Sequence, residues 1–106
     1  MTSTVTIKLA PSVLASEIYS KIYTNKASAL NLVEENQNLY KVCSSFTVTA
    51  DGIDAAEEAF DITNNPSRQK ERESLYGRGR SVSVGDVVEV DGVNYVCAPT
   101  GWIKLV

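Results

Sequence analysis

Residues 81–106 read SVSVGDVVEVDGVNYVCAPTGWIKLV, and this stretch decides the fold. A valine-rich run leads into Asp91-Gly92, a pair that typically closes two-residue β-hairpins because both positions tolerate positive φ. Beyond the pair, apolar residues recur at every second position, namely Val93, Tyr95 and Cys97. A two-residue period is typical of a strand with one buried face. The last quarter of the chain is therefore predicted to be entirely β.

Two earlier segments also have β character. Residues 4–9, TVTIKL, alternate between apolar and polar side chains, as a half-buried strand does. Residues 39–50, LYKVCSSFTVTA, are rich in β-branched and aromatic residues and are predicted to be a strand. The Ser44-Ser45 pair within it indicates a bulge or bend.

Helical periodicity occupies the segments between these strands. Residues 12–23 repeat apolar side chains every four positions, and residues 27–35 either continue that helix or start another. A further helix is predicted from Asp54, with Asp54 as its N-cap and Glu57 completing a capping box. Asn64-Asn65-Pro66 ends it, because the residue before a proline disfavours helical angles. A short helical turn is expected within the polar residues 68–76.

These segments predict an α+β fold with a small antiparallel sheet and one or two helices packed on it. The 106 residues suit a single domain, 1–106, that buries roughly two-thirds of its unfolded surface. Hydrophobic content of 43% and charged content of 22% are ordinary for a globular protein.

Composition argues against catalysis. The chain has no histidine, the usual general base near neutral pH and the commonest zinc ligand. Cys43 and Cys97 are expected to be buried free thiols. Ser81 and Ser83 have no base at a recognisable spacing, so turn and strand hydrogen bonding is their favoured role, and Asp86 is expected to accept from nearby backbone N–H groups. We therefore expect no catalytic residues, no metal and no cofactor.

No apolar run approaches the roughly 20 residues that a membrane-spanning helix needs. The first 20 residues also lack the basic and apolar regions of a signal peptide. A cytoplasmic protein without membrane contact is the expectation.

Charge is unevenly distributed. Residues 51–65 carry a net charge of −5, and the acidic helix within them contributes Asp54, Glu57, Glu58 and Asp61. Such a run of carboxylates could imitate a phosphate backbone and occupy the nucleic-acid groove of a partner protein. The alternative is a solvated helix face, which is the usual role of a charge run.

Residues 66–80 carry a net charge of +3 and include every arginine in the chain: Arg68, Arg72, Arg78 and Arg80. The planar guanidinium suits phosphate or carboxylate, and Tyr76 could stack on a base, so this loop is a candidate nucleic-acid contact. The alternative is that the basic loop pairs with the acidic helix. The whole-chain charge of −3 favours this pairing.

The second half of the chain resembles a known family. An acidic–hydrophobic helix and a basic, glycine-containing loop precede Gly79-Arg80-Ser81-Val82-Ser83-Val84-Gly85-Asp86-Val87-Val88, then a hairpin with Tyr95, then Gly101-Trp102. Residues 54–105 are in this respect similar to the YodL-like domain of phage, plasmid and other mobile-element proteins. The basic loop is longer here, and Cys97-Ala98-Pro99 replaces more polar residues. The resemblance implies a mobile-element origin and no particular activity.

The function expected from these features is that of a small phage or mobile-element interaction protein in the host cytoplasm. It would bind and modulate a host protein through the acidic helix and the arginine loop, for instance as an anti-CRISPR or anti-restriction inhibitor. The alternative is a nucleic-acid-binding accessory protein that uses the arginine-rich loop 68–80.

Overall fold

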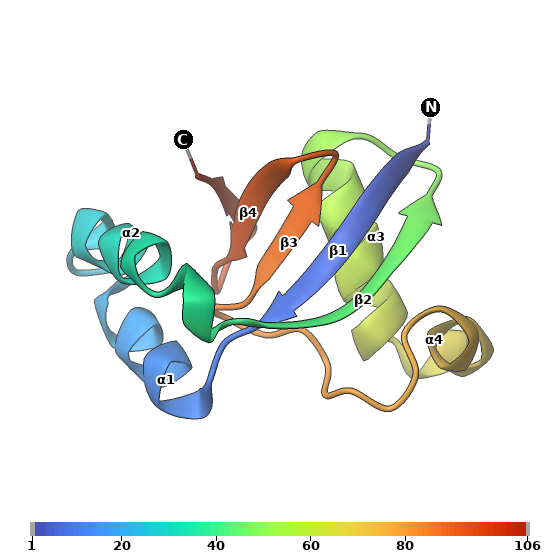
Figure 1. The fold of residues 1–106 in the computed structure, drawn as a ribbon, viewed down its shortest axis with the longest axis horizontal. Helices are drawn as coiled ribbons and strands as arrows, with labels where there is room; N and C mark the ends of the chain where they lie inside the picture. The colour runs from blue at the N-terminus through green and yellow to red at the C-terminus, as the bar shows by residue number, and fades with distance from the viewer. Residues whose placement is uncertain (1, 106) are drawn as a thin grey trace.

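The computed structural model describes residues 2–105, which form a five-stranded antiparallel sheet with helices on both faces (Figure 1). Along the chain the elements are β1 (Ser3–Leu9), α1 (Ser12–Lys21), α2 (Lys26–Glu35), η1 (Gln37–Leu39), β2 (Lys41–Val48), α3 (Gly52–Asn64), η2 (Pro66–Arg68), α4 (Gln69–Leu75), β3 (Val87–Val90), β4 (Val93–Cys97) and β5 (Trp102–Lys104). The strand order across the sheet is β2-β1-β3-β4-β5. The predicted α+β class with a small antiparallel sheet is confirmed.

Helix α3 covers one face of the sheet. Its buried side includes three alanines with no exposed surface, Ala55, Ala56 and Ala59, so the helix backbone can approach the strands closely. Opposite them lie the alternate residues of four strands, which form the main core: Val5, Ile7, Leu9, Phe46, Val48, Val88, Val90, Tyr95 and Cys97. Burying one such aliphatic side chain stabilises the fold by about 1.5–3 kcal/mol.

Helices α1 and α2 lie side by side at one end of the sheet (Figure 1). Ile18 and Val33 are fully buried there against Val87 and Val96 of the second sheet face. Farther along the same face the side chains are polar, and Lys8 Nζ lies 2.7 Å from Glu89 Oε1. The apolar contact therefore covers only part of this face.

The predicted hairpin is present between β3 and β4. Asp91 has φ +47° and Gly92 φ +87°, the two positive values that this kind of two-residue turn requires. Val90 pairs with Val93 directly across it. The predicted irregularity in the 39–50 strand is also present, since Ile7 pairs with Ser44 and Lys8 with Val42. Cys43 is therefore the extra residue of a bulge, one position before the predicted Ser44-Ser45 pair.

Two local predictions are corrected. Helix α3 begins at Gly52 with Asp51 at its N-cap and no side-chain cap bond, so Asp54 is not a capping residue. Residues 81–86 form no strand. Of the two alternatives for residues 27–35, the structure has a separate helix, and the side chain of Asn25 accepts from Ser28 N at its start. The predicted turn within residues 68–76 is α4.

Buried protonated side chains predict unfolding at high pH. Burial raises the pKa of Cys97 from 9.0 to about 12 and that of Tyr76 from 10.0 to about 12. It also raises the pKa of Tyr40, whose hydroxyl donates to the Gly85 carbonyl. Because each folded pKa exceeds its unfolded value, the stabilisation is complete below about pH 9 and is lost as the pH rises through the folded values.

We expect the free energy of unfolding to fall by about 1.4 kcal/mol per pH unit for each group between its two pKa values. Urea unfolding at pH 7, 9 and 11 measures this loss. Cys97→Ala removes one titrating group and should flatten the decline. A free energy of unfolding that stays constant from pH 7 to 11 would contradict the assignment.

Candidate partner-binding surface

The carboxylates of α3 lie on one side of the helix. Asp54, Glu57, Glu58 and Asp61 stand at positions i, i+3, i+4 and i+7, which places them on a single face. The opposite face carries the buried alanines, so these four carboxylates, the acidic stripe, point away from the sheet. The sequence predicted this grouping correctly, because helical periodicity sets it within one element.

The acidic stripe does not stabilise its own helix. Asp54 and Glu58, like Glu57 and Asp61, are like-charged i,i+4 pairs, and each pair costs about 0.2–0.5 kcal/mol. Asp61 also lies in the last turn of α3, where the helix dipole disfavours a negative charge. Only Asp54, in the first turn, has a favourable place relative to that dipole.

Arg68 forms ion pairs with Glu58 and Asp61, the C-terminal half of the stripe. Its Nη1 lies 2.5 Å from Glu58 Oε1 and 2.9 Å from Asp61 Oδ2, and its Nη2 lies 2.7 Å from Glu71 Oε2. The hydrogen bond to Glu71 is the largest of the causes that raise the pKa of Arg68, and the same bond lowers the pKa of Glu71. The pairing of basic loop with acidic helix is thus present at this arginine.

Pairing with Arg68 leaves the surface negative. The stripe and Glu71 together contain five carboxylates, and Arg68 is the guanidinium that pairs with three of them. The net charge of these six side chains is −4. Among the described residues, no cationic side chain forms an ion pair with Asp54 or Glu57. The N-terminal half of the stripe therefore remains open to a charged partner.

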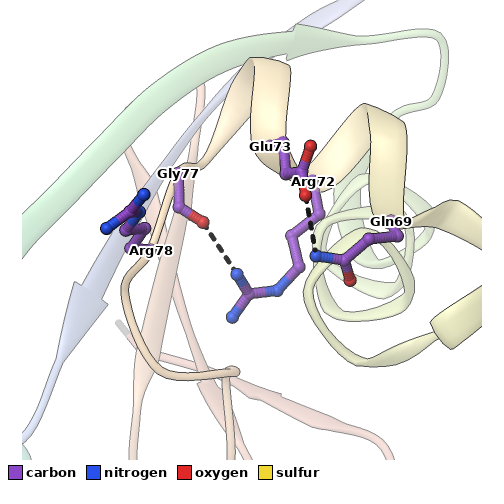
Figure 2. Close-up of a pocket in the computed structure, with 5 residues that line it drawn as sticks. All are labelled: Gln69, Arg72, Glu73, Gly77 and Arg78. Atoms are coloured by element: carbon purple, nitrogen blue, oxygen red, sulfur yellow. Dashed lines mark hydrogen bonds between the residues drawn. The ribbon is translucent and has the colours of Figure 1, made fainter.

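Arg72 lies in a hollow of about 650 Å³ lined by residues of α4 and the following turn: Gln69, Arg72, Glu73, Gly77 and Arg78. Its guanidinium donates to the carbonyls of Thr63, Gly77 and Gly79 at 3.1, 2.7 and 2.5 Å. Figure 2 shows it pointing toward the Gly77 carbonyl, whereas the guanidinium of Arg78 is turned away. The two arginines therefore do not converge on one anion.

Arg80 is bound to Asp86, a carboxylate with no exposed surface. Its Nη1 and Nη2 lie 2.6 and 2.8 Å from the two carboxylate oxygens, and Nη2 also donates to the Ala10 carbonyl. Asp86 accepts from the backbone nitrogens of Ala10 and Ser83 as well, each at 2.8 Å. This confirms the backbone-binding role predicted for Asp86, while the guanidinium partner was not predicted.

Tyr76 is 7% exposed. Its hydroxyl donates to the Arg80 carbonyl, and the Arg72 guanidinium lies 5.2 Å from the centre of its ring. In this position the ring presents no free face to a nucleic-acid base, so the predicted stacking role does not fit the structure.

Trp102 of β5 packs against the main core. It is half-buried beside α3, its indole nitrogen donates to Glu57, and its ring meets that of Phe60 edge-on. Sequence reasoning missed this contact because the two residues are 45 positions apart. Within the same described chain, no group of three or more potential metal-ligating side chains comes together.

None of the helices within residues 2–105 has the length and apolar composition needed to cross a membrane. Comparison of the chain with protein-family models, with curated proteins and with solved structures finds no match, so its resemblance to the YodL-like domain stays a prediction.

Proposed function

We propose that this protein is a small interaction protein of a phage or mobile element, and that it binds and modulates a host protein through the acidic stripe. The observation that carries the proposal is the arrangement of four carboxylates on the outward face of α3, with a net charge of −4 after Arg68 and Glu71 are counted. These like charges lower the stability of the isolated helix, and within the described residues only Arg68 pairs with them. A cationic partner would therefore gain favourable charge interactions with the stripe.

The spacing of the stripe suggests the kind of surface it fits. Asp61 follows Asp54 by seven residues of helix, a rise of about 10.5 Å, and the three steps between successive carboxylates are about 4.5, 1.5 and 4.5 Å, a mean of ~3.5 Å. One strand of duplex DNA carries a negative charge every ~3.4 Å. The proposed target is therefore the cationic nucleic-acid groove of a host protein, and inhibition of a CRISPR or restriction effector is the most concrete form of the proposal.

Direct binding of nucleic acid has less support. Arg68, Arg72 and Arg80 are all engaged by carboxylates or carbonyls of the chain itself. Lys70 and Arg78 are exposed and have no hydrogen-bonded or ionic partner among the described residues, but Glu71 and Glu73 lie on the same short helix. The basic loop thus has few cations to offer a phosphate backbone.

Affinity capture from host lysate, with and without nuclease, tests the proposal. We expect a host protein to be retained equally in both samples, because the contact is between protein side chains. We also expect no saturable binding of a fluorescent DNA duplex or single-stranded RNA in physiological salt. Loss of the captured protein after nuclease treatment, together with nucleic-acid binding that weakens with salt, would instead support the accessory-protein alternative.

A further inference from the structure

A small pocket lies between α3 and the turn that joins β4 to β5. Its walls include Phe60 and Glu57 of α3, together with Pro99, Gly101 and Trp102, and its volume is about 140 Å³. Pockets for whole small-molecule ligands usually measure ~300–1,000 Å³. This pocket has room for one side chain.

Two aromatic rings form its apolar wall. The ring centres of Phe60 and Trp102 are 6.2 Å apart and their planes meet at 84°. Both residues are half-buried, so packing fixes the positions of the two rings while part of each ring surface stays accessible. An aromatic face attracts a cation through its quadrupole, and tryptophan does so most strongly.

One carboxylate completes the pocket. Glu57 Oε1 accepts from the indole nitrogen of Trp102, which fixes the carboxylate at the pocket wall. Its other oxygen, Oε2, has no hydrogen-bonded partner among residues 2–105, and no lysine or arginine of that range forms an ion pair with Glu57. The pocket thus combines a negative charge with aromatic surface and lacks a positive group.

We propose that this pocket receives a lysine side chain of the bound host protein, an inference that rests on the function proposed above. The alkyl stem of the lysine would pack on Pro99 and the rings, while its ammonium group meets the open oxygen of Glu57. Glu57 belongs to both the pocket and the acidic stripe, so the lysine inserts where the two surfaces meet. A tryptophan in such a place is the residue type that typically dominates binding energy.

The single tryptophan of the chain makes the pocket directly measurable. Trp102 fluorescence would be followed during titration with Nα-acetyl-lysine N-methylamide, and with the uncharged norleucine analogue as its matched control. We expect saturable binding of the lysine probe in the millimolar range and none of the norleucine compound. Glu57→Gln should weaken binding by about fivefold or more.

Glu34→Gln is the matched variant, since it makes the same change at an exposed glutamate of α2, outside both the pocket and the acidic stripe. It should leave the affinity for the probe within about twofold, because the charge of an exposed side chain is strongly screened. Equal binding of lysine and norleucine probes, or equal weakening by the two variants, would overturn the assignment. Host capture without probe binding would reject the pocket alone, whereas probe binding without host capture would reject the proposed function.

Discussion

Asp86→Ala is expected to lower the free energy of unfolding by about 2–4 kcal/mol, since it removes a fully buried acceptor of charge-assisted hydrogen bonds, while the partly exposed Arg80 is left to water. Four donors converge on the Asp86 carboxylate: two from Arg80 and the backbone nitrogens of Ala10 and Ser83. The Ala10–Asp86 bond is buried, and an unsatisfied buried N–H adds to the loss. Typical domains have only about 5–15 kcal/mol of stability in total.

Urea unfolding of the variant against the unsubstituted protein measures this loss. Asp86→Asn should be intermediate, because the amide retains one acceptor oxygen but turns a donor toward Arg80. Asp91→Ala is the comparison: Asp91 is an exposed aspartate that accepts from the backbone nitrogen of Thr4, and its loss of about 1–2 kcal/mol includes the strain of alanine at a φ of +47°. If both alanine variants lose only about 1 kcal/mol, the bonding assigned to Asp86 is wrong.

Arg72→Ala is expected to cost about 2–4 kcal/mol, because a charged donor serves three backbone carbonyls. These carbonyls belong to Thr63 at the end of α3 and to Gly77 and Gly79, so the guanidinium fastens the segment after α4 to α3. Arg72→Lys should recover little, because an ammonium lacks the planar fork that reaches three acceptors.

Arg78→Ala gives the comparison, because Arg78 is exposed and its guanidinium points away from that of Arg72 (Figure 2). Its free energy of unfolding should change by no more than about 0.5 kcal/mol. Amide hydrogen exchange of residues 77–80 should accelerate in Arg72→Ala and not in Arg78→Ala. Similar exchange in the two variants would show that Arg72 does not hold this segment.

The contrast between Arg72, which is bonded to the chain itself, and the exposed Arg78 affects how arginine substitutions are interpreted. A loss of binding in Arg72→Ala or an equivalent Arg80 variant would follow from the lost fold contacts, whether or not the arginine touches a partner. Arg78 is the arginine at which a loss of binding would instead indicate direct contact.

Periodicity within single elements predicted most of the fold. The Asp91-Gly92 pair specified its hairpin, and the alternation of residues 4–9 specified which face of β1 is buried. The acidic stripe was predictable for the same reason, since spacing along one helix determines which side chains share a face. The short helix α4 was also expected from local pattern, whereas the irregular segment 81–86 depends on contacts between distant residues, such as those of Ser81 and Val82 with Thr63.

The arginine loop shows that limit most clearly. Its composition suggested an anion-binding surface, but the whole-chain charge favoured pairing with the acidic helix, and Arg68 does pair with Glu58, ten positions away. Arg80 donates to Ala10, seventy positions away, and Tyr76 fills the core instead of the surface. Charge therefore predicted the pairing of Arg68, whereas the backbone acceptors of Arg72 and Arg80 depend on the tertiary fold.

The affinity of the captured host protein for a charge-reversed stripe tests the central claim most directly. Asp54→Lys/Glu57→Lys reverses two charges on α3, and Glu34→Lys/Glu35→Lys makes the same change on exposed residues of α2, across the sheet. By isothermal titration, the first pair should weaken binding about 100-fold or more, and the second by less than about threefold. Equal affinity of the two double variants, with both folded by circular dichroism, would contradict binding through the acidic stripe.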